Sequence, residues 1–212
     1  TSIHDYDDEL LNDYHDGINK GKAQLIIFHL LGQHFQYSAR CKSDMKRFSI
    51  KDYTRSNLSD HAKQTIADYD NATLYNDFVL SKIVERFRNK EAIVVYLSDH
   101  GEDCYGKDVD MAGRLTEVEN IDVKKYHEEF EIPFWIWCSP AYRQRHHKIF
   151  IEIMKARHNR FMTDDLPHLL LYLAGISTKE YKAERNVLSP RFNNRRPRLV
   201  LNSIDYDKAL HQ

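Results

Sequence analysis

The chain has 212 residues, of which 42% are hydrophobic and 12% aromatic, so it is long enough to bury a core and form one domain. Lys and Arg (31) almost balance Asp and Glu (32), and the formal charge of −1 excludes the strongly basic character typical of nucleic-acid-binding proteins. The longest apolar stretches, LIIFHLL and HLLLYLAGI, fall far short of the roughly 20 residues that cross a bilayer. The chain as given is therefore predicted to be soluble.

The predicted elements alternate between helices and continuous apolar strands. Residues 5–19 place apolar residues near helical spacing behind a front of acids, which predicts a helix. The run AQLIIFHLLG, residues 23–32, predicts a strand closed by a glycine, and residues 62–88 predict a long helix. AIVVYLSDH (92–100) and IPFWIWCS (132–139) predict two more strands, 140–158 and 164–174 two further helices, and RPRLVLN (196–202) a short edge strand.

Continuous apolar strands separated by helices are typical of a mostly parallel sheet with helices on both faces. We therefore predict an α/β fold. In such a sheet the carboxyl ends of the strands face one crevice, where ligand-binding residues gather. Asp99 and His100 leave the end of one predicted strand, and His29 and His34 lie in and just past the end of another.

Asp99 and His100 are the candidate metal ligands. Neighbouring residues of a strand point to opposite faces, so these two meet one ion only if the backbone turns, which Gly101 permits. A carboxylate with an imidazole favours zinc, whereas calcium and magnesium prefer oxygen ligands throughout. We predict zinc, ahead of Ca and Mn. Because such pairs also cap helices or hold loops, spacing alone leaves a structural role open.

Four motifs in chain order resemble the catalytic domain of the phosphoethanolamine transferases, a membrane-anchored branch of the alkaline phosphatase and sulfatase superfamily. They are IIFHLLGQHFQYSAR, YDNATLYNDFVLSKIVERF, YLSDHGED and FEIPFWIW, and they cover the chain from about residue 5 to about residue 190. SDHGE is shared across the superfamily. The HxxGxH stretch followed by an aromatic residue and Arg, with YDN downstream, narrows the resemblance to this branch, and it implies an alkaline-phosphatase-like fold.

The resemblance also implies roles for individual residues. Asp99 and His100 match zinc ligands, and His34 matches a histidine that contacts the transferred phosphoryl group or a second zinc. His29 matches another histidine of the same stretch. Glu102 matches a glutamate of the substrate pocket, where it could receive the ethanolamine ammonium. The family's threonine nucleophile and a further zinc-binding acid lie upstream of the aligned part, so no catalytic nucleophile is assigned in this chain.

The chain departs from the family pattern after the Asp-His pair. The family often has a His-Gly about twelve residues later, where this chain has Ala112, Gly113 and Arg114. His127 is a candidate to replace that histidine. Arg114 could meet a phosphate with two hydrogen bonds or could be a loop charge, and the sequence leaves these alternatives open.

The three cysteines give no evidence of a sulfatase nucleophile or of a particular disulfide. Cys138 and Arg143 resemble the sulfatase signature Cys-x-Pro-x-Arg, but the arginine stands one position too late, and Pro140 at a helix start explains the segment without chemistry. Cys41, Cys104 and Cys138 permit one disulfide or none, and the sequence does not decide which.

Taken together, residues 1–212 are expected to be the C-terminal portion of one zinc-dependent phosphoethanolamine transferase catalytic domain. The resemblance implies a phospholipid head-group donor, lipid A or a related phosphorylated glycan as acceptor, membrane helices N-terminal to this chain, and a place on the periplasmic face of the inner membrane. The isolated chain is expected to lack turnover. A sulfatase or phosphodiesterase of the same superfamily, or a non-catalytic binding module on the same scaffold, remain the alternatives. No nucleic-acid partner is expected.

Overall fold

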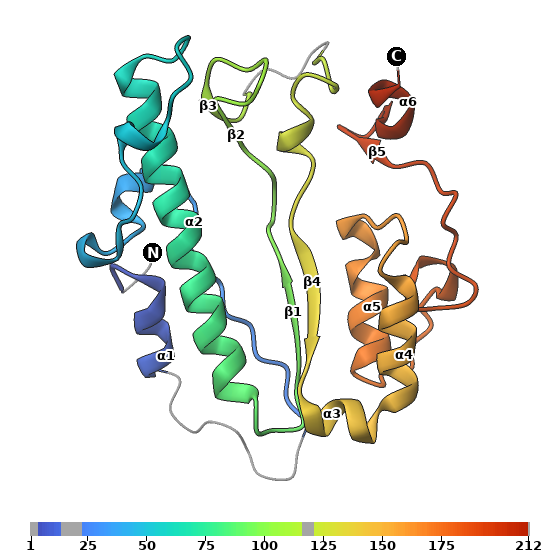
Figure 1. Cartoon of the computed structure of the whole chain (residues 1–212). Coiled ribbons are helices and arrows are strands. Elements are labelled where there is room, and N and C mark those ends of the chain that lie inside the picture. Colours follow the sequence, from blue (N-terminus) through green and yellow to red (C-terminus); the bar gives the residue numbers. More distant parts are fainter. Residues whose placement is uncertain (1–3, 14–22, 116–120, 212) are drawn as a thin grey trace. The chain divides into compact units, whose positions relative to one another are not determined.

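The computed structural model describes residues 4–13, 23–115 and 121–211 (Figure 1). It divides into two compact units. The first unit comprises residues 1–86 and 99–132, and the second comprises residues 87–98 and 133–212. Among the helices of the described ranges, none combines the length and the apolar character needed to cross a bilayer.

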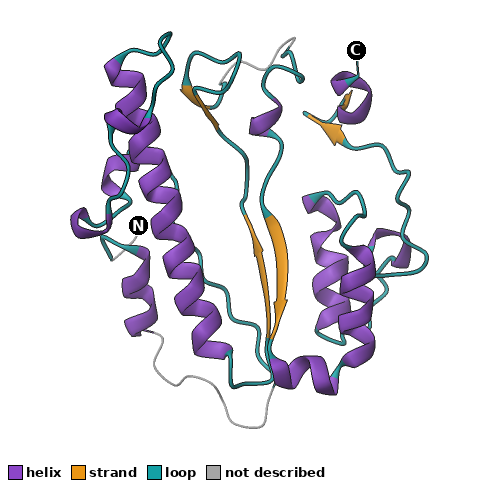
Figure 2. Ribbon diagram, viewed as in Figure 1, coloured by secondary structure: helices purple, strands orange, loops and turns teal. Residues whose placement is uncertain are grey.

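Helix α2 (Asp60–Phe87) dominates the first unit and confirms the long helix predicted from periodicity (Figure 2). Ser59 caps its start, since the Ser59 hydroxyl oxygen accepts a hydrogen bond from the Ala62 amide at 3.1 Å. The buried apolar residues of the helix are alanines in its N-terminal half and larger residues in its C-terminal half. They are Ala62, Ala67, Ala72, Tyr75, Val79, Ile83 and Phe87.

Asn71 of the YDN motif explains why a polar residue lies among these buried residues. Its side-chain oxygen accepts hydrogen bonds from the Arg47 and Phe48 amides at 2.6 and 2.9 Å, and its amide nitrogen donates to the Phe48 carbonyl at 2.9 Å. Asn71 therefore makes three side-chain hydrogen bonds while only 1% exposed. The motif fastens a neighbouring loop to α2.

Short elements surround α2 in the first unit. The helix predicted over residues 5–19 is present as two short pieces, η1 and α1, and the remainder of that range lies outside the described residues. The 3₁₀ helices are η1 (Asp7–Glu9), η2 (Tyr37–Ala39), η3 (Ser43–Met45), η4 (Ile50–Asp52) and η5 (His127–Glu129); α1 is Leu10–Asp13, and β2 (Asp103–Cys104) pairs with β3 (Ala112–Gly113) in an antiparallel hairpin.

The segment at residues 23–31 corrects one strand prediction. Its described backbone joins no sheet, although its side chains alternate between exposed and half-buried as in a strand. Leu25 and Ile27 are 77% and 79% exposed. Its apolar residues favour a strand, but a strand is defined by its backbone pairing in a sheet, and this segment belongs to none of the sheets of the described residues.

The described strands of the second unit do not confirm the predicted parallel sheet. Strand β1 (Ile93–Leu97) and strand β4 (Phe134–Cys138) exist as predicted, but they pair antiparallel, with Ile93 opposite Cys138 and Leu97 opposite Phe134 (Figure 1). All three sheets of the described residues are two-stranded and antiparallel. A parallel pair needs a crossover, usually helical, and the described residues between β1 and β4 contain only η5 and a short hairpin.

The helix predicted over residues 140–158 is divided into α3 (Pro140–Arg145) and α4 (His147–Ala156) by the non-helical backbone of His146. Ser139 begins α3 and is fully buried; its hydroxyl oxygen accepts from the Tyr142 amide at 3.0 Å and from the Ala92 amide at 3.2 Å. Capping by Ser139, with Pro140 in the first turn, accounts for this stretch without chemistry.

The core of the second unit lies between α4 and α5 (Leu166–Leu173), which run side by side (Figure 2). Helix α5 ends as predicted at Gly175, whose φ of +66° suits a helix C-terminus. The predicted edge strand is reduced to β5 (Leu199–Val200), which pairs with β6 (Ile204–Asp205). The remaining elements are η6 (Thr163–Asp165), η7 (Ala183–Arg185) and α6 (Tyr206–Leu210), and the fully or largely buried core residues are Leu169, Val187 and Leu188.

Candidate functional site

The side chains of Asp99 and His100 lie together in the first unit. Asp99 Oδ2 is 3.7 Å from His100 Nε2, and Asp99 Oδ1 accepts a hydrogen bond from the His100 backbone amide at 3.1 Å. The His100 Nδ1–H donates to the Gly101 carbonyl at 2.9 Å. Because a carbonyl can only accept, Nδ1 carries the proton and Nε2 of the neutral ring keeps its lone pair. A histidine that donates from one ring nitrogen to a backbone carbonyl is oriented as metal-binding histidines are.

Gly101 is held against the turn that contains η5. Its amide donates to the Glu129 carbonyl at 3.2 Å. A Cβ atom at residue 101 would lie 1.9 Å from the Glu128 carbonyl oxygen and 2.7 Å from that of Glu131. Only glycine permits this approach, so the turn fixes the backbone between His100 and Glu102.

His34 is positioned by Asp7, which lies outside its motif, and by Arg40, the last residue of the motif. Asp7, which is buried, accepts hydrogen bonds from the Leu31 amide at 2.9 Å and the Gly32 amide at 2.8 Å. Arg40 holds the other side of the loop, donating to the carbonyls of His34 and Phe35, both at 3.2 Å. The loop therefore has a defined conformation, although the side chains of His34 and His29 are exposed.

Glu102 lies beside two aromatic rings. Tyr37 is 4% exposed, and its ring meets that of Tyr69 edge to face at a centroid distance of 5.1 Å. Burial and the neighbouring Glu102 carboxylate raise the pKa of Tyr37 well above its ordinary value, although the Tyr37 hydroxyl makes no hydrogen bond of regular geometry. Burial and Glu102 likewise raise the pKa of Tyr69 to about 12. The Glu102 carboxylate thus lies next to a surface formed by the aromatic rings of Tyr37 and Tyr69.

Asp103, directly after the motif, is the most unusual carboxyl of this region. It is 1% exposed, and neither of its oxygens has a hydrogen-bond partner among the described residues. Burial, followed by the charges of Glu128 and Glu129, raises its pKa to about 6. Asp103, Tyr37 and Asp7 were not among the residues predicted from the sequence. The motifs did contain a signal for Tyr37, which follows HxxGxH at a fixed position, and for Asp103, an acid where the strand end becomes buried.

The structure brings together only part of the predicted site. Asp99 and His100 meet, but no cluster of three or more His, Cys, Asp or Glu side chains able to hold a metal is found within residues 4–13, 23–115 and 121–211. His127 Nδ1 donates to the Lys124 carbonyl at 3.1 Å, and Arg114 is exposed. Cys41, Cys104 and Cys138 are all free thiols, so no disulfide forms.

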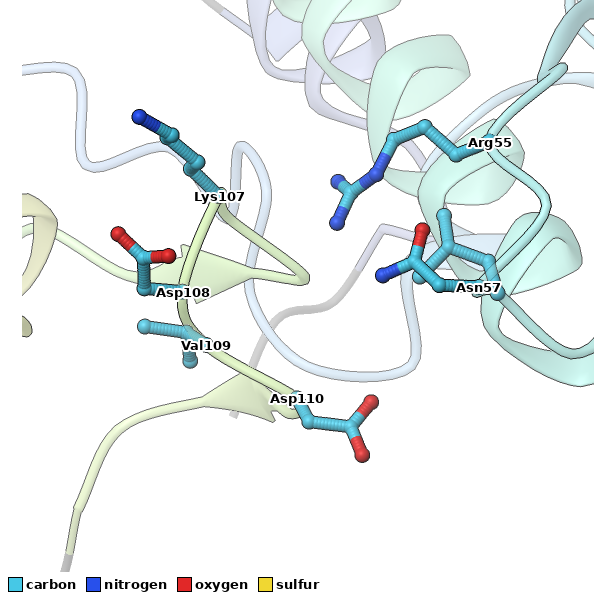
Figure 3. Close-up of a pocket in the computed structure, with 7 residues that line it drawn as sticks. Arg55, Asn57, Lys107, Asp108, Val109 and Asp110 are labelled. Atoms are coloured by element: carbon cyan, nitrogen blue, oxygen red, sulfur yellow. The ribbon is translucent and has the colours of Figure 1, made fainter.

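A hollow of about 300 Å³ lies between the end of the loop before α2 and the β2–β3 hairpin (Figure 3). Although Arg55 and Lys107 both line it, the Lys107 side chain points away from Arg55. The Arg55 guanidinium donates to the Tyr105 carbonyl at 2.6 Å and to the Gly106 carbonyl at 3.3 Å. Arg55 therefore fastens the hairpin, and the hollow does not present a pair of cations to an anion.

Comparisons with known proteins identify the family to which the chain is similar. The sulfatase family model matches residues 2–176. Phosphoethanolamine transferase EptC of Escherichia coli is 31% identical over 195 residues, covering 90% of this chain and 32% of the relative. Kdo(2)-lipid A phosphoethanolamine 7''-transferase of Escherichia coli is 31% identical over 126 residues, 59% of this chain and 21% of the relative. The chain thus spans about a third or less of the length of these curated relatives.

Solved structures give the same fold. The C-terminal periplasmic domain of Escherichia coli EptC matches with a TM-score of 0.76 at 27% identity, covering 97% of this chain and 59% of that one. A second structure of that domain, in complex with Zn, matches with a TM-score of 0.72 at 28% identity and covers 98% of this chain and 58% of that one. The fold class is therefore that of sulfatase-superfamily catalytic domains.

We predict that Gly101→Ala destabilises the first unit by about 1–3 kcal/mol or more, because the added Cβ collides with backbone atoms that cannot rotate away. Urea unfolding followed by circular dichroism measures the loss, and the NMR signals of the His100 ring should shift. Gly106→Ala is the matched control, since its Cβ would meet only side-chain atoms, the Glu128 carboxylate at 3.3 Å and Asp103 Oδ1 at 3.6 Å. Equal losses in the two variants would contradict the proposed role of Gly101.

The buried Asp103 makes a pH-dependent contribution to stability. Since its pKa is raised from 3.8 to about 6 in the folded chain, folding is favoured by this residue below pH 3.8, and that contribution is lost as pH rises through about 6. Asp103→Asn removes this ionisable group. The difference in the free energy of unfolding between the variant and the wild type should therefore shift in favour of the variant by about 2–3 kcal/mol when the pH is raised from below 3.8 to above 6.

Urea unfolding across this pH range measures the difference between Asp103→Asn and wild type. Asp110→Asn removes the same charge from an exposed position of the same hairpin and is the matched control. If both variants give the same pH profile, Asp103 is not the group responsible.

Proposed function

The chain belongs to the sulfatase family, in its phosphoethanolamine transferase branch, and from this membership we propose that it is the C-terminal portion of a zinc-dependent phosphoethanolamine transferase catalytic domain. The observation that carries the proposal is the pairing of Asp99 with His100, whose Nδ1–H is bound to a backbone carbonyl while Nε2 faces the carboxylate. A structural cap would not require this arrangement of the ring.

Asp99 and His100 fit zinc as two of its ligands. An aspartate oxygen and an imidazole nitrogen are both zinc donors in proteins, and the Gly101 carbonyl holds the ring in the tautomer that zinc requires. When bound, zinc polarises the phosphoryl oxygens. Support from outside this chain comes from the Escherichia coli EptC domain, which has been solved in complex with Zn.

The other predicted residues take roles in binding substrate. His34, on a loop held by Asp7 and Arg40, would stabilise the negative charge of the phosphoryl group, and His29 of the same stretch would assist it. The Glu102 carboxylate would receive the ethanolamine ammonium beside the rings of Tyr37 and Tyr69, where aromatic faces add to the attraction of a cation. These assignments rest on the motif positions and on the local contacts within the first unit.

The proposed reaction moves a head group from a phospholipid donor to lipid A or a related phosphorylated glycan. In the proposed full protein, the nucleophilic threonine and a third zinc ligand come from sequence that precedes this chain, as do membrane helices that keep the domain at the periplasmic face of the inner membrane. The names of the relatives, one of them a lipid A transferase, support phosphoethanolamine as the transferred group and lipid A as the acceptor.

We predict that the isolated chain binds zinc only weakly and has no transferase turnover. A catalytic zinc normally has three protein ligands, and the described residues bring only two together. Metal analysis after dialysis should find zinc well below one equivalent, and His100→Ala should lower it further, while the exposed His147→Ala should not. Stoichiometric zinc accompanied by head-group transfer would refute the prediction.

In the proposed full protein, Glu102→Gln should reduce the preference for the charged head group. Losing a carboxylate that pairs with an ammonium should lower kcat/KM for phosphatidylethanolamine about tenfold, and should leave an N-acylated donor, which has no ammonium, nearly unchanged. Asp77→Asn, an exposed change on α2, is the control. An equal loss for both donors would argue against ammonium recognition, and hydrolysis of sulfate esters without any head-group transfer would favour the sulfatase alternative.

A further inference from the structure

A second cavity of the first unit, of about 270 Å³, has a lining unlike that of the hollow at Arg55. Its walls come from the loop around η2, the N-terminal half of α2 and the β2–β3 hairpin; α2 and the hairpin are neighbours in Figure 1. Three aromatic side chains and several uncharged polar groups face it. The lining includes Phe35, Tyr37, His61, Thr65, Asp68 and Tyr105.

The cavity adjoins the candidate site through the loop around η2. Phe35 directly follows His34 in the chain, and its ring meets that of Tyr37 edge to face at 6.0 Å. Tyr37 in turn lies beside Glu102. A molecule in the cavity would therefore contact the loop that follows His34 and the aromatic ring next to Glu102.

Two of its lining residues, Gln36 and Tyr105, have positive φ angles of 69° and 51°, which are uncommon for residues other than glycine. Hydrogen bonds from arginine side chains hold the backbone at both positions. Arg40 donates to the Phe35 carbonyl just before Gln36, and Arg55 donates to the Tyr105 carbonyl. Backbone held in such conformations by surrounding contacts is frequent at ligand sites.

The chemistry of the lining selects the class of ligand. None of its described lining residues is Lys or Arg, so it lacks the donors that recognise phosphate. Its one carboxylate, Asp68, already accepts from the Gln64 side chain at 3.2 Å and lies 3.9 Å from Lys46 Nζ, so little charge remains for an ammonium. Aromatic faces beside hydroxyl, amide and imidazole groups fit an uncharged ring that carries many hydroxyls.

We propose that this cavity, formed by Phe35, Tyr37, Tyr105 and the N-terminal half of α2, binds a sugar ring of the glycan acceptor. The apolar C–H face of the ring packs on Phe35 and Tyr105, and its hydroxyls hydrogen-bond to His61, Thr65 and Asp68. The proposal rests on the proposed transferase function for the identity of the acceptor. It adds the position of the acceptor, on the His34 side of Glu102.

NMR titration of the 212-residue chain with N-acetylglucosamine tests the cavity directly. Signals of Phe35, Thr65 and Tyr105 should shift on titration, and Phe35→Leu, which keeps an apolar side chain but removes the flat ring, should weaken binding about tenfold. Phe35→Trp should retain it. Phe35 is 63% exposed, so these variants are expected to fold, and their unperturbed spectra check this.

Phe48→Leu is the matched control, because Phe48 is also partly exposed, at 39%, but does not line the cavity. Binding that survives Phe35→Leu unchanged would overturn the proposal. So would shifts of the same signals by ethanolamine or inorganic phosphate in place of the sugar.

A transfer assay on the proposed full protein separates the two proposals. If the acceptor subsite is right, Phe35→Leu raises the KM for the glycan acceptor about tenfold and leaves the KM for the phospholipid donor unchanged. Equal effects on donor and acceptor would overturn the subsite while leaving the transferase function intact. Absence of any head-group transfer by the wild-type protein, with sugar binding still lost in Phe35→Leu, would overturn the transferase function alone.

Discussion

The contact between the backbone of Gly101 and the turn at residues 128–131 is the constraint on which the candidate site depends. Its requirement is for space, because a Cβ would overlap the Glu128 carbonyl oxygen, and not for an unusual φ. Because no side chain separates them, the SDHGE motif and the turn at residues 128–131 are in direct backbone contact. Together they orient the carbonyl to which His100 donates and carry the carboxylates that act on Asp103.

Local patterns predicted the elements better than their pairing. Helix α2 and strands β1 and β4 lie within a few residues of their predicted bounds, because helical spacing and apolar runs are properties of neighbouring residues. A continuous apolar run, however, fits an antiparallel partner as well as a parallel one. The mostly parallel sheet is not confirmed, and β1 and β4 pair antiparallel, because pairing depends on how the residues between the strands fold, which periodicity does not describe.

In the candidate site, too, residues within a local motif could be predicted, and residues that act through distant contacts could not. Asp99, His100 and Glu102 could be found from their motif, and the structure adds the reason that the ring of His100 is oriented as it is. Asp7 could not be found, since its hydrogen bonds to Leu31 and Gly32 join segments more than 20 residues apart. Such residues carry no local signal, because their role arises only when the chain has folded.

The extended segment at residues 23–31 affects how the isolated chain behaves in solution. It forms no sheet among the described residues, and it exposes the large apolar side chains of Leu25 and Ile27 along one face. A row of exposed apolar side chains on an extended segment favours association with the same segment of another molecule. Self-association should therefore set in as the protein is concentrated, and Lys at residue 25 or 27 is the change that would suppress it, since a charge interrupts an aggregation-prone apolar run.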